Sequence, residues 1–247
     1  MIQVIDFETT GLIDPQPVQY AQVVFSESSM AIPRWEFEEV NILPTKPMEY
    51  GAMGVTGITN EFLAENYDLK YEDIKSGKGW IGEGVEYLVS HNTAYDTKFI
   101  CPEQLSKLKV LCTLKLARKL IDKSLCGDHK NSTLYYYLGC YKKPSYPARM
   151  TKTHSALTDA LMTTEVLLAL LKKFNLTIEQ AYNLTLGNEV EKEEDITICP
   201  FQKYKGIPWK QVVRKDADYC LWLLSGGKIR SKLMADHVDK LLGGLIG

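Results

Sequence analysis

Two carboxylates, Asp6 and Glu8, stand two residues apart near the start of the chain, within the stretch Ile5 to Gly11. Successive side chains of a strand alternate between its faces, so Asp6 and Glu8 share one face and their apolar neighbours share the other. Two like charges side by side repel, and such a pair is stable mainly when a cation lies between them. A hard divalent metal ion is the favoured candidate. The alternative is an exposed acidic strand end.

Two further carboxylates, Asp96 and Asp159, stand in segments that can complete such a site. Asp96 ends the stretch Ser90 to Asp96, and we expect it in the first turn of a helix over residues 94–105, where the helix dipole favours an anion by ~0.3–1 kcal/mol. Asp159 follows His154 by five residues, and residues at that spacing lie about 140° apart on a helix. We therefore expect His154 in a loop and Asp159 inside the first turns of the following helix.

The pattern of apolar and turn residues along the rest of the chain predicts the strands and helices that position these groups. Alternating apolar residues bounded by turn residues predict short strands over residues 1–7, 18–26, 35–43 and 109–113. Residues 160–171 are apolar nearly all round, which predicts a helix buried against the sheet. Thr59 is expected to cap a helix that follows it.

In order and type, the three acidic segments resemble the motifs of the DEDD exonuclease superfamily. This superfamily includes the proofreading subunit of bacterial replicative polymerase, oligoribonuclease, ribonuclease T and exodeoxyribonuclease X. The carboxylates that match its motifs are Asp6, Glu8, Asp96 and Asp159. His154 stands at the spacing of the histidine branch, called DEDDh or DnaQ-like, and the layout is most similar to exodeoxyribonuclease X-like proteins. The resemblance covers roughly the first 175 residues.

The resemblance implies an α/β, ribonuclease H-like fold with a mixed central sheet flanked by helices. It implies a metal-dependent 3′–5′ exonuclease, a phosphodiester hydrolase that releases 5′-mononucleotides from single-stranded or frayed DNA 3′ ends. Two divalent ions, Mg²⁺ or Mn²⁺, would be held by the four carboxylates Asp6, Glu8, Asp96 and Asp159. His154 would act as the general base.

The turn after the first motif is expected to meet the terminal 3′-hydroxyl of the substrate. The expected substrate contacts are Thr9, Thr10, Gly11, Leu12, Ile13 and Asn92. We hypothesise that Leu12 or Ile13 presses on the last base. For Leu12, packing inside its own turn is an equally open alternative.

The chain has a modest net charge, −2, but its charges are unevenly distributed. Residues 1–97 carry 5 Lys/Arg and 16 Asp/Glu, whereas residues 98–152 carry 12 and 3. A basic middle beside an acidic first part is expected where phosphates are held near a carboxylate metal site. The alternative is a solvated helix face that is rich in lysine.

The last part of the chain differs in residue composition from the rest. We predict an exonuclease domain over residues 1–186, an acidic linker over 187–195 and a small C-terminal module over 196–247. The segment Phe201 to Trp209 resembles the Phe-Gly-Lys-Tyr-Lys-Gly module found after some exodeoxyribonuclease X-like nuclease domains, with Gln202 in place of the Gly. Aromatic residues interleaved with lysines can stack bases and hold phosphates. We interpret Trp209 and Trp222 as a small core.

Composition also indicates the cellular compartment of the protein. Six cysteines without close pairs indicate thiols in a reducing compartment. The first residues do not form a signal-peptide pattern, and no apolar run reaches the ~18 residues of a membrane span. We therefore expect a cytoplasmic protein without a membrane partner, acting on nucleic acid with a free 3′ end, DNA preferred. The resemblance suggests a polymerase or a DNA repair protein as partner.

Two other functions stay open at this point. One is an RNA 3′-end trimming exonuclease of the ribonuclease T or oligoribonuclease type. The other is a non-catalytic, proofreading-like module that binds nucleic acid. The intact set of five catalytic-type residues argues against the second, because a protein that only binds does not need all five.

Overall fold

The computed structural model describes residues 1–27, 35–147, 154–186, 197–229 and 232–244. The chain forms two compact units, Met1–Gly187 and Asn188–Gly247. The expected acidic linker at 187–195 lies outside the described residues.

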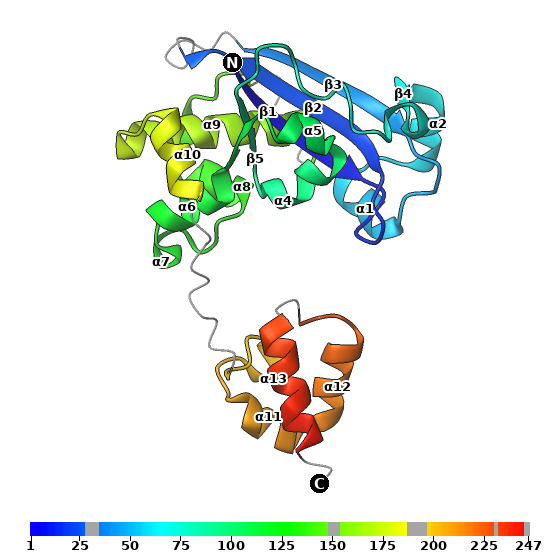
Figure 1. Cartoon of the computed structure of the whole chain (residues 1–247), viewed down its shortest axis with the longest axis vertical. Coiled ribbons are helices and arrows are strands. Elements are labelled where there is room, and N and C mark those ends of the chain that lie inside the picture. The colour runs from blue at the N-terminus through cyan, green and yellow to red at the C-terminus, as the bar shows by residue number, and fades with distance from the viewer. Residues whose placement is uncertain (28–34, 148–153, 187–196, 230–231, 245–247) are drawn as a thin grey trace. The chain divides into compact units, whose positions relative to one another are not determined.

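The first unit is built on a six-stranded mixed sheet with the strand order β4-β3-β2-β1-β5-β6 (Figure 1). Strands β1, β2 and β3 pair antiparallel, β5 is parallel to β1 and to β6, and β4 is parallel to β3. The strands are β1 Ile2–Thr9, β2 Pro17–Phe25, β3 Glu36–Leu43, β4 Leu69–Lys70, β5 Tyr87–Ser90 and β6 Lys109–Cys112. The predicted strands at 1–7, 18–26, 35–43 and 109–113 are confirmed.

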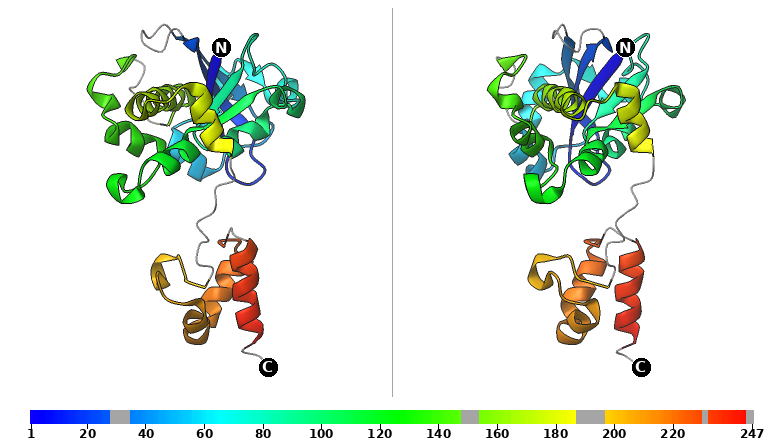
Figure 2. Two further views of the ribbon diagram at one scale, coloured as in Figure 1. Left: turned by 60° about the vertical axis from the view of Figure 1, so that its left-hand side comes forward. Right: turned by 90° about the vertical axis from the view of Figure 1, so that its left-hand side faces the viewer.

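Helices flank both faces of this sheet. Helix α9 packs along β1 and β2, with α6 and α8 against it, and Figure 2 shows it beside the first strands in two further views. Apolar residues of α3 and α5 cover the other face. The helices of this unit are α1 Tyr50–Thr56, α2 Asn60–Asn66, α3 Tyr71–Ile74, α4 Thr93–Asp96, α5 Pro102–Leu105, α6 Thr113–Leu120, α7 Lys123–Cys126, α8 Asn131–Tyr137, α9 Ala156–Phe174 and α10 Ile178–Leu186.

Strand β1 separates two apolar cores, as its alternation predicts. Val4 joins the core that surrounds α9, whereas Ile5 and Phe7 join the core on the opposite face. The Phe7 ring packs 5.5 Å from Trp80, edge on, between ring centroids. Asp6 and Glu8 therefore lie on the α9 side of the sheet, because they share the face of Val4.

The predicted helix over residues 94–105 is wrong, because the chain breaks there into three short pieces. Helix α4 ends at Asp96, a 3-10 turn follows over Thr97–Phe99, and α5 begins only at Pro102. Cys101 has φ −54° and ψ 128°. A residue before proline is pushed out of the helical region by the proline ring, and proline has no N–H to continue a helix.

Two local predictions hold. The Thr59 side chain accepts a hydrogen bond from the Phe62 N–H at 3.1 Å and caps α2. Helix α9 is buried on most sides, as its composition predicts. Among the described helices, none is both long and apolar enough to cross a membrane. All six cysteines are free thiols.

The second unit is a small helical core around Trp209, which is fully buried. Its helices are α11 Trp209–Lys215, α12 Ala217–Ser225 and α13 Lys232–Gly243. The expectation that Trp222 shares this core is wrong, because the Trp222 side chain is 55% exposed. Cys220 and Leu223 define the buried side of α12. Trp222 is two residues from Cys220, which turns it away from that side.

Candidate active site

Three carboxylates from β1 and α9 meet on the α9 side of the sheet. Asp6, Glu8 and Asp159 can each offer one oxygen such that all three atoms lie within 4.8 Å of one another. Asp6 and Glu8 are on one face of β1, and Asp159 is in the first turn of α9. The packing of α9 on β1 thus brings together carboxylates that are far apart in the sequence.

The start of α9 is fixed by side chains from the meander. The Ala156 N–H donates to Gln19 Oε1 at 2.9 Å, and the Leu157 N–H donates to Glu39 Oε1 at 3.1 Å. The Ser155 hydroxyl accepts from the N–H three residues later at 3.3 Å. These bonds satisfy the free N–H groups of the first helical turn. These bonds fix the position of Asp159 relative to β1.

The fourth carboxylate, Asp96, is buried at the end of α4, directly after β5. Among the neighbouring charges, that of Asp96 raises the pKa of Asp6 the most. The Tyr95 and Thr9 hydroxyls lie 2.6 Å apart and tie this segment to the end of β1. Neither Tyr95 nor the Gln19 and Glu39 caps were found from the sequence, because such contacts between distant residues have no local pattern.

The electrostatics of the cluster favour a bound cation. Burial raises the pKa of Asp6 well above its ordinary value, and repulsion from Asp96, Asp159 and Glu8 raises it further. Burial likewise raises the pKa of Asp159, and that of Asp96 to about 7. A divalent cation among these oxygens relieves both the repulsion and the lost hydration. An all-oxygen donor set of this kind fits Mg²⁺ or Mn²⁺.

His154 lies in the segment directly before α9, as the five-residue spacing predicts. Its Nδ1 is 4.0 Å from Asp159 Oδ2, and its side chain is 57% exposed. The backbone φ of His154 is +60°, in the left-handed region where histidine is enriched relative to most other residues. The imidazole is thus at the edge of the carboxylate cluster and open to solvent.

The loop after β1 is held by the segment that leads into α1. The Glu49 N–H donates to the Thr10 carbonyl at 2.7 Å, and the Gln16 N–H donates to the Thr10 hydroxyl at 3.1 Å. A Cβ on Gly11 would lie 2.1 Å from Glu49 Cδ, so a larger residue there displaces the Glu49 carboxylate. The Thr9 hydroxyl donates to the Gly11 carbonyl at 3.0 Å.

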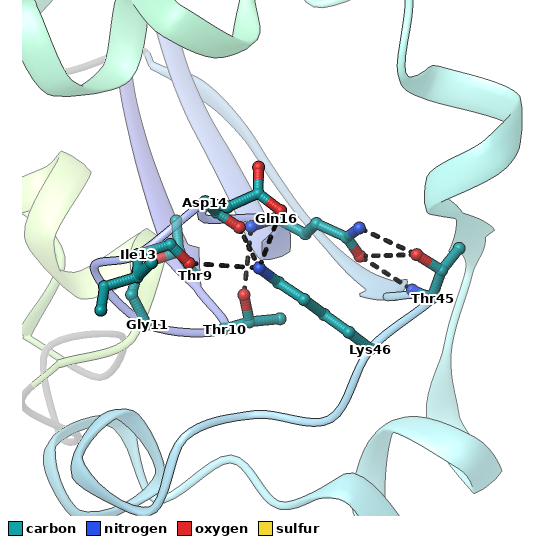
Figure 3. Close-up of polar contacts among 8 residues, drawn as sticks. All are labelled: Thr9, Thr10, Gly11, Ile13, Asp14, Gln16, Thr45 and Lys46. Atoms are coloured by element: carbon teal, nitrogen blue, oxygen red, sulfur yellow. Dashed lines mark hydrogen bonds and ion pairs between the residues drawn. The ribbon is translucent and has the colours of Figure 1, made fainter.

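Lys46 and Thr45 hold the far part of this loop (Figure 3). Lys46 Nζ donates to the Ile13 carbonyl at 3.2 Å and also contacts the Asp14 carbonyl and carboxylate. Thr45 bonds the Gln16 side chain through its N–H and hydroxyl.

The apolar tip of the loop stays in solvent. Leu12 is 76% and Ile13 80% exposed. Leu12 therefore does not pack inside its own turn, and both side chains are free to meet a ligand.

Two neighbouring residues of the second motif, Asn92 and His91, have different roles. Asn92 is exposed at the start of α4 with φ 74°, a conformation that Asn tolerates. His91 is engaged on both ring nitrogens, by the Thr113 hydroxyl at 2.9 Å and the His129 carbonyl at 3.0 Å. Burial lowers the pKa of His91 to about 4. His91 supports the motif, and Asn92 is available to a ligand.

Not every cation of the basic segment at 98–152 is free for phosphate. Lys109 Nζ contacts Glu179 at 2.6 Å and Glu86 at 3.0 Å. Lys98, by contrast, lies 5.4 Å from the ring centroid of Tyr95 in the second motif. Lys98 is exposed.

Comparison with known proteins decides the family. Residues 3–167 match the RNase_T family model, whose description is exonuclease. The chain belongs to this exonuclease family. The matched range contains the five residues that the three motifs contribute, namely Asp6, Glu8, Asp96, His154 and Asp159. A search of curated protein sequences found no match.

Solved structures share the fold of this exonuclease-family chain. Exonuclease X in complex with 5′ overhanging duplex DNA is 24% identical, with a TM-score of 0.55 over 75% of this chain and 99% of that one. The nuclease domain of 3′hExo, a DEDDh family member bound to rAMP, is 17% identical, with a TM-score of 0.50 over 70% and 92%. E. coli Exonuclease I in complex with a 5cy-dT13 oligonucleotide is 14% identical, with a TM-score of 0.55 over 74% of this chain and 42% of that one. The ribonuclease H-like fold is thereby confirmed.

Proposed function

We propose that this chain is a metal-dependent 3′–5′ exonuclease that releases 5′-mononucleotides from DNA, from single-stranded or frayed ends. The observation that carries the proposal is the approach of Asp6, Glu8 and Asp159 to within 4.8 Å, inside a domain of the exonuclease family. DNA is supported as the substrate because Exonuclease X and E. coli Exonuclease I were solved with DNA.

The carboxylates Asp6, Glu8, Asp96 and Asp159 would hold two divalent ions, Mg²⁺ or Mn²⁺. When bound, these ions stabilise the charge that develops on the attacking and leaving oxygens of a phosphodiester. The chain supplies the rest of the chemistry. The carboxylates repel one another, which favours a cation of high charge among them, and the caps on α9 keep Asp159 in place.

His154 is the proposed general base. Its exposed position lets the imidazole reach the water that attacks the last phosphodiester. Because Nδ1 faces the Asp159 carboxylate at 4.0 Å, Nε2 is the nitrogen that takes the proton. The same carboxylate then stabilises the imidazolium that forms.

Replacing His154 by Asn should slow turnover about 10²- to 10⁴-fold. Asn tolerates the left-handed backbone at this position, so the fold should be unchanged. The rate of nucleotide release is measured together with the thermal stabilisation by Mn²⁺, which should persist because the carboxylates remain. His154→Gly serves as a second variant that also suits the backbone. Full activity in both variants would remove His154 from the reaction.

The loop after β1 is the proposed site for the 3′ end. Backbone groups of Thr9, Thr10 and Gly11 would meet the terminal nucleotide, and Asn92 would contact the strand from the second motif. Leu12 and Ile13 would press on the last base, which their exposure supports.

The double change Leu12→Ala and Ile13→Ala should lower kcat/KM about tenfold, because two apolar contacts with the base are lost. The loss should be larger on paired ends than on single strands, since only paired ends need to be opened. Leu125→Ala, which removes another exposed leucine of the same unit, is the matched control. Equal rates for wild type and double variant on both substrates would refute the wedge.

RNA trimming is the second candidate, favoured by the ribonucleotide bound to 3′hExo. The initial rates on matched single-stranded DNA and RNA decide between the two substrates. If the protein cleaves neither polymer but binds them, a non-catalytic module would be supported instead.

The same proposal includes the domain organisation, the cellular compartment and the partner of the protein. Residues 1–186 would form the exonuclease domain and residues 196–247 the small C-terminal module. Six free thiols suit the reducing cytoplasm. A polymerase or a DNA repair protein is the proposed class of partner.

A further inference from the structure

The second unit exposes a stacked pair of aromatic rings on α12. The Trp222 ring lies 5.9 Å from the Tyr219 ring between centroids, with 25° between the planes. Trp222 is 55% exposed and the adjacent Leu221 52%, whereas Trp35, Trp80 and Trp209 are all buried. Tyr219 packs partly against the core of this unit, whereas Trp222 does not, so this Tyr219–Trp222 platform presents the Trp222 ring to solvent.

Cations surround this platform. Lys203 Nζ lies 4.9 Å from the Tyr219 centroid, and Lys228 Nζ lies 5.8 Å from the Trp222 centroid. Asp216 holds Lys203 in place through a contact of 2.6 Å. Residues 197–247 carry nine Lys/Arg and four Asp/Glu, a net charge of +5. The surface therefore favours an anionic ligand with flat rings.

We propose that the Tyr219–Trp222 platform binds single-stranded nucleic acid. A base stacks on Trp222, and Lys228 contacts a neighbouring phosphate, while Lys203 stays paired with Asp216 beside the Tyr219 ring. Base stacking on aromatic side chains is stronger than an exposed cation–π contact, so Lys228 moves from the ring to a phosphate when a base arrives. A duplex keeps its base faces covered and has no ring to offer. An acidic peptide would meet the lysines but leave the rings unused.

The inference rests on the proposed function in one respect, namely that the bound strand is the one whose 3′ end the first unit degrades. Binding by the second unit then raises the effective concentration of a long strand at the first unit. A dinucleotide is too short to gain from this. Long substrates should therefore depend on Trp222, and dinucleotides should not.

The test uses the full chain in chelator, where no strand is degraded. The anisotropy of a dye-labelled long oligothymidylate gives the affinity of wild type, Trp222→Ala, Trp222→Phe and Leu221→Ala. We expect Trp222→Ala to weaken binding about fivefold or more, Trp222→Phe to retain most of it, and Leu221→Ala to match wild type. Oligothymidylate should also quench the tryptophan fluorescence of wild type and not that of Trp222→Phe.

Two results would overturn the inference. One is wild-type affinity in Trp222→Ala, and the other is an equal loss in Leu221→Ala, which would indicate an unspecific apolar patch. Turnover of a dinucleotide in Mg²⁺ is measured separately and should be the same in all four proteins. If wild type cleaves no substrate yet binds in a Trp222-dependent way, the proposed function fails and the inference stands.

Discussion

Replacing Asp6 by Asn is expected to lower the rate of nucleotide release about a thousandfold or more. Asp6 is one of three carboxylates whose oxygens converge within 4.8 Å, and the charges of Glu8, Asp159 and Asp96 all act on it. Asn keeps the shape of the side chain and removes the charge that holds a cation. The measurement is kcat/KM on long single-stranded DNA in Mg²⁺.

The loss of activity in Asp6→Asn must come from the change at the active site and not from unfolding of the protein. Asp6→Asn should unfold no more easily than wild type, because the change removes a repelled buried charge. Asp73→Asn alters an exposed carboxylate on α3 of the same unit and is the matched control. Activity in Asp6→Asn that equals that of Asp73→Asn would contradict the assignment of the cluster.

The second large effect concerns stability without metal. The pKa of Asp96 is 3.8 in its ordinary state and about 7 in the folded protein, where the side chain is buried. The folded state thus binds this proton more tightly than the unfolded chain. Metal-free protein should lose stability as the pH rises from about 4 through about 7, because Asp96 must then ionise while buried.

Asp96→Asn should consequently stabilise the metal-free protein at about pH 8, by up to about 4 kcal/mol, and change little at about pH 4. Urea unfolding in chelator at the two pH values measures this. Added Mn²⁺ should stabilise wild type more at the higher pH, where the carboxylates are free of protons, and should stabilise Asp96→Asn less. Destabilisation of metal-free Asp96→Asn at about pH 8 would show that the ionised carboxylate is not costly there.

Local periodicity made much of the first unit predictable. The alternation along β1 places Asp6 and Glu8 on one face, and the apolar run of α9 predicts its burial. The spacing of His154 and Asp159 separates loop from helix. Each of these signals lies within a few neighbouring residues, where the geometry of strands and helices is nearly fixed.

The contacts that hold the site together were not predictable in this way. Gln19 and Glu39 cap a helix more than a hundred residues further along the chain, and Tyr95 meets Thr9 across two strands. An ordinary polar residue in a strand carries no sign of such a partner.

Two errors had different origins. The break before α5 could have been foreseen from Pro102, which disfavours a helical residue ahead of it. The exposure of Trp222 could not be foreseen from its type, because tryptophan usually lies in a core. Only its place on α12 relative to Cys220 and Leu223 turns it outward.

The proposed activity is tested by following a single-stranded DNA that carries a label at its 5′ end, with wild-type protein, in Mg²⁺ and in chelator. We expect a ladder of labelled strands that shortens one nucleotide at a time from the 3′ end, with 5′-mononucleotides released, and no shortening in chelator. Release of the labelled 5′ nucleotide first, internal cuts, or equal cleavage in chelator would contradict a metal-dependent 3′–5′ exonuclease.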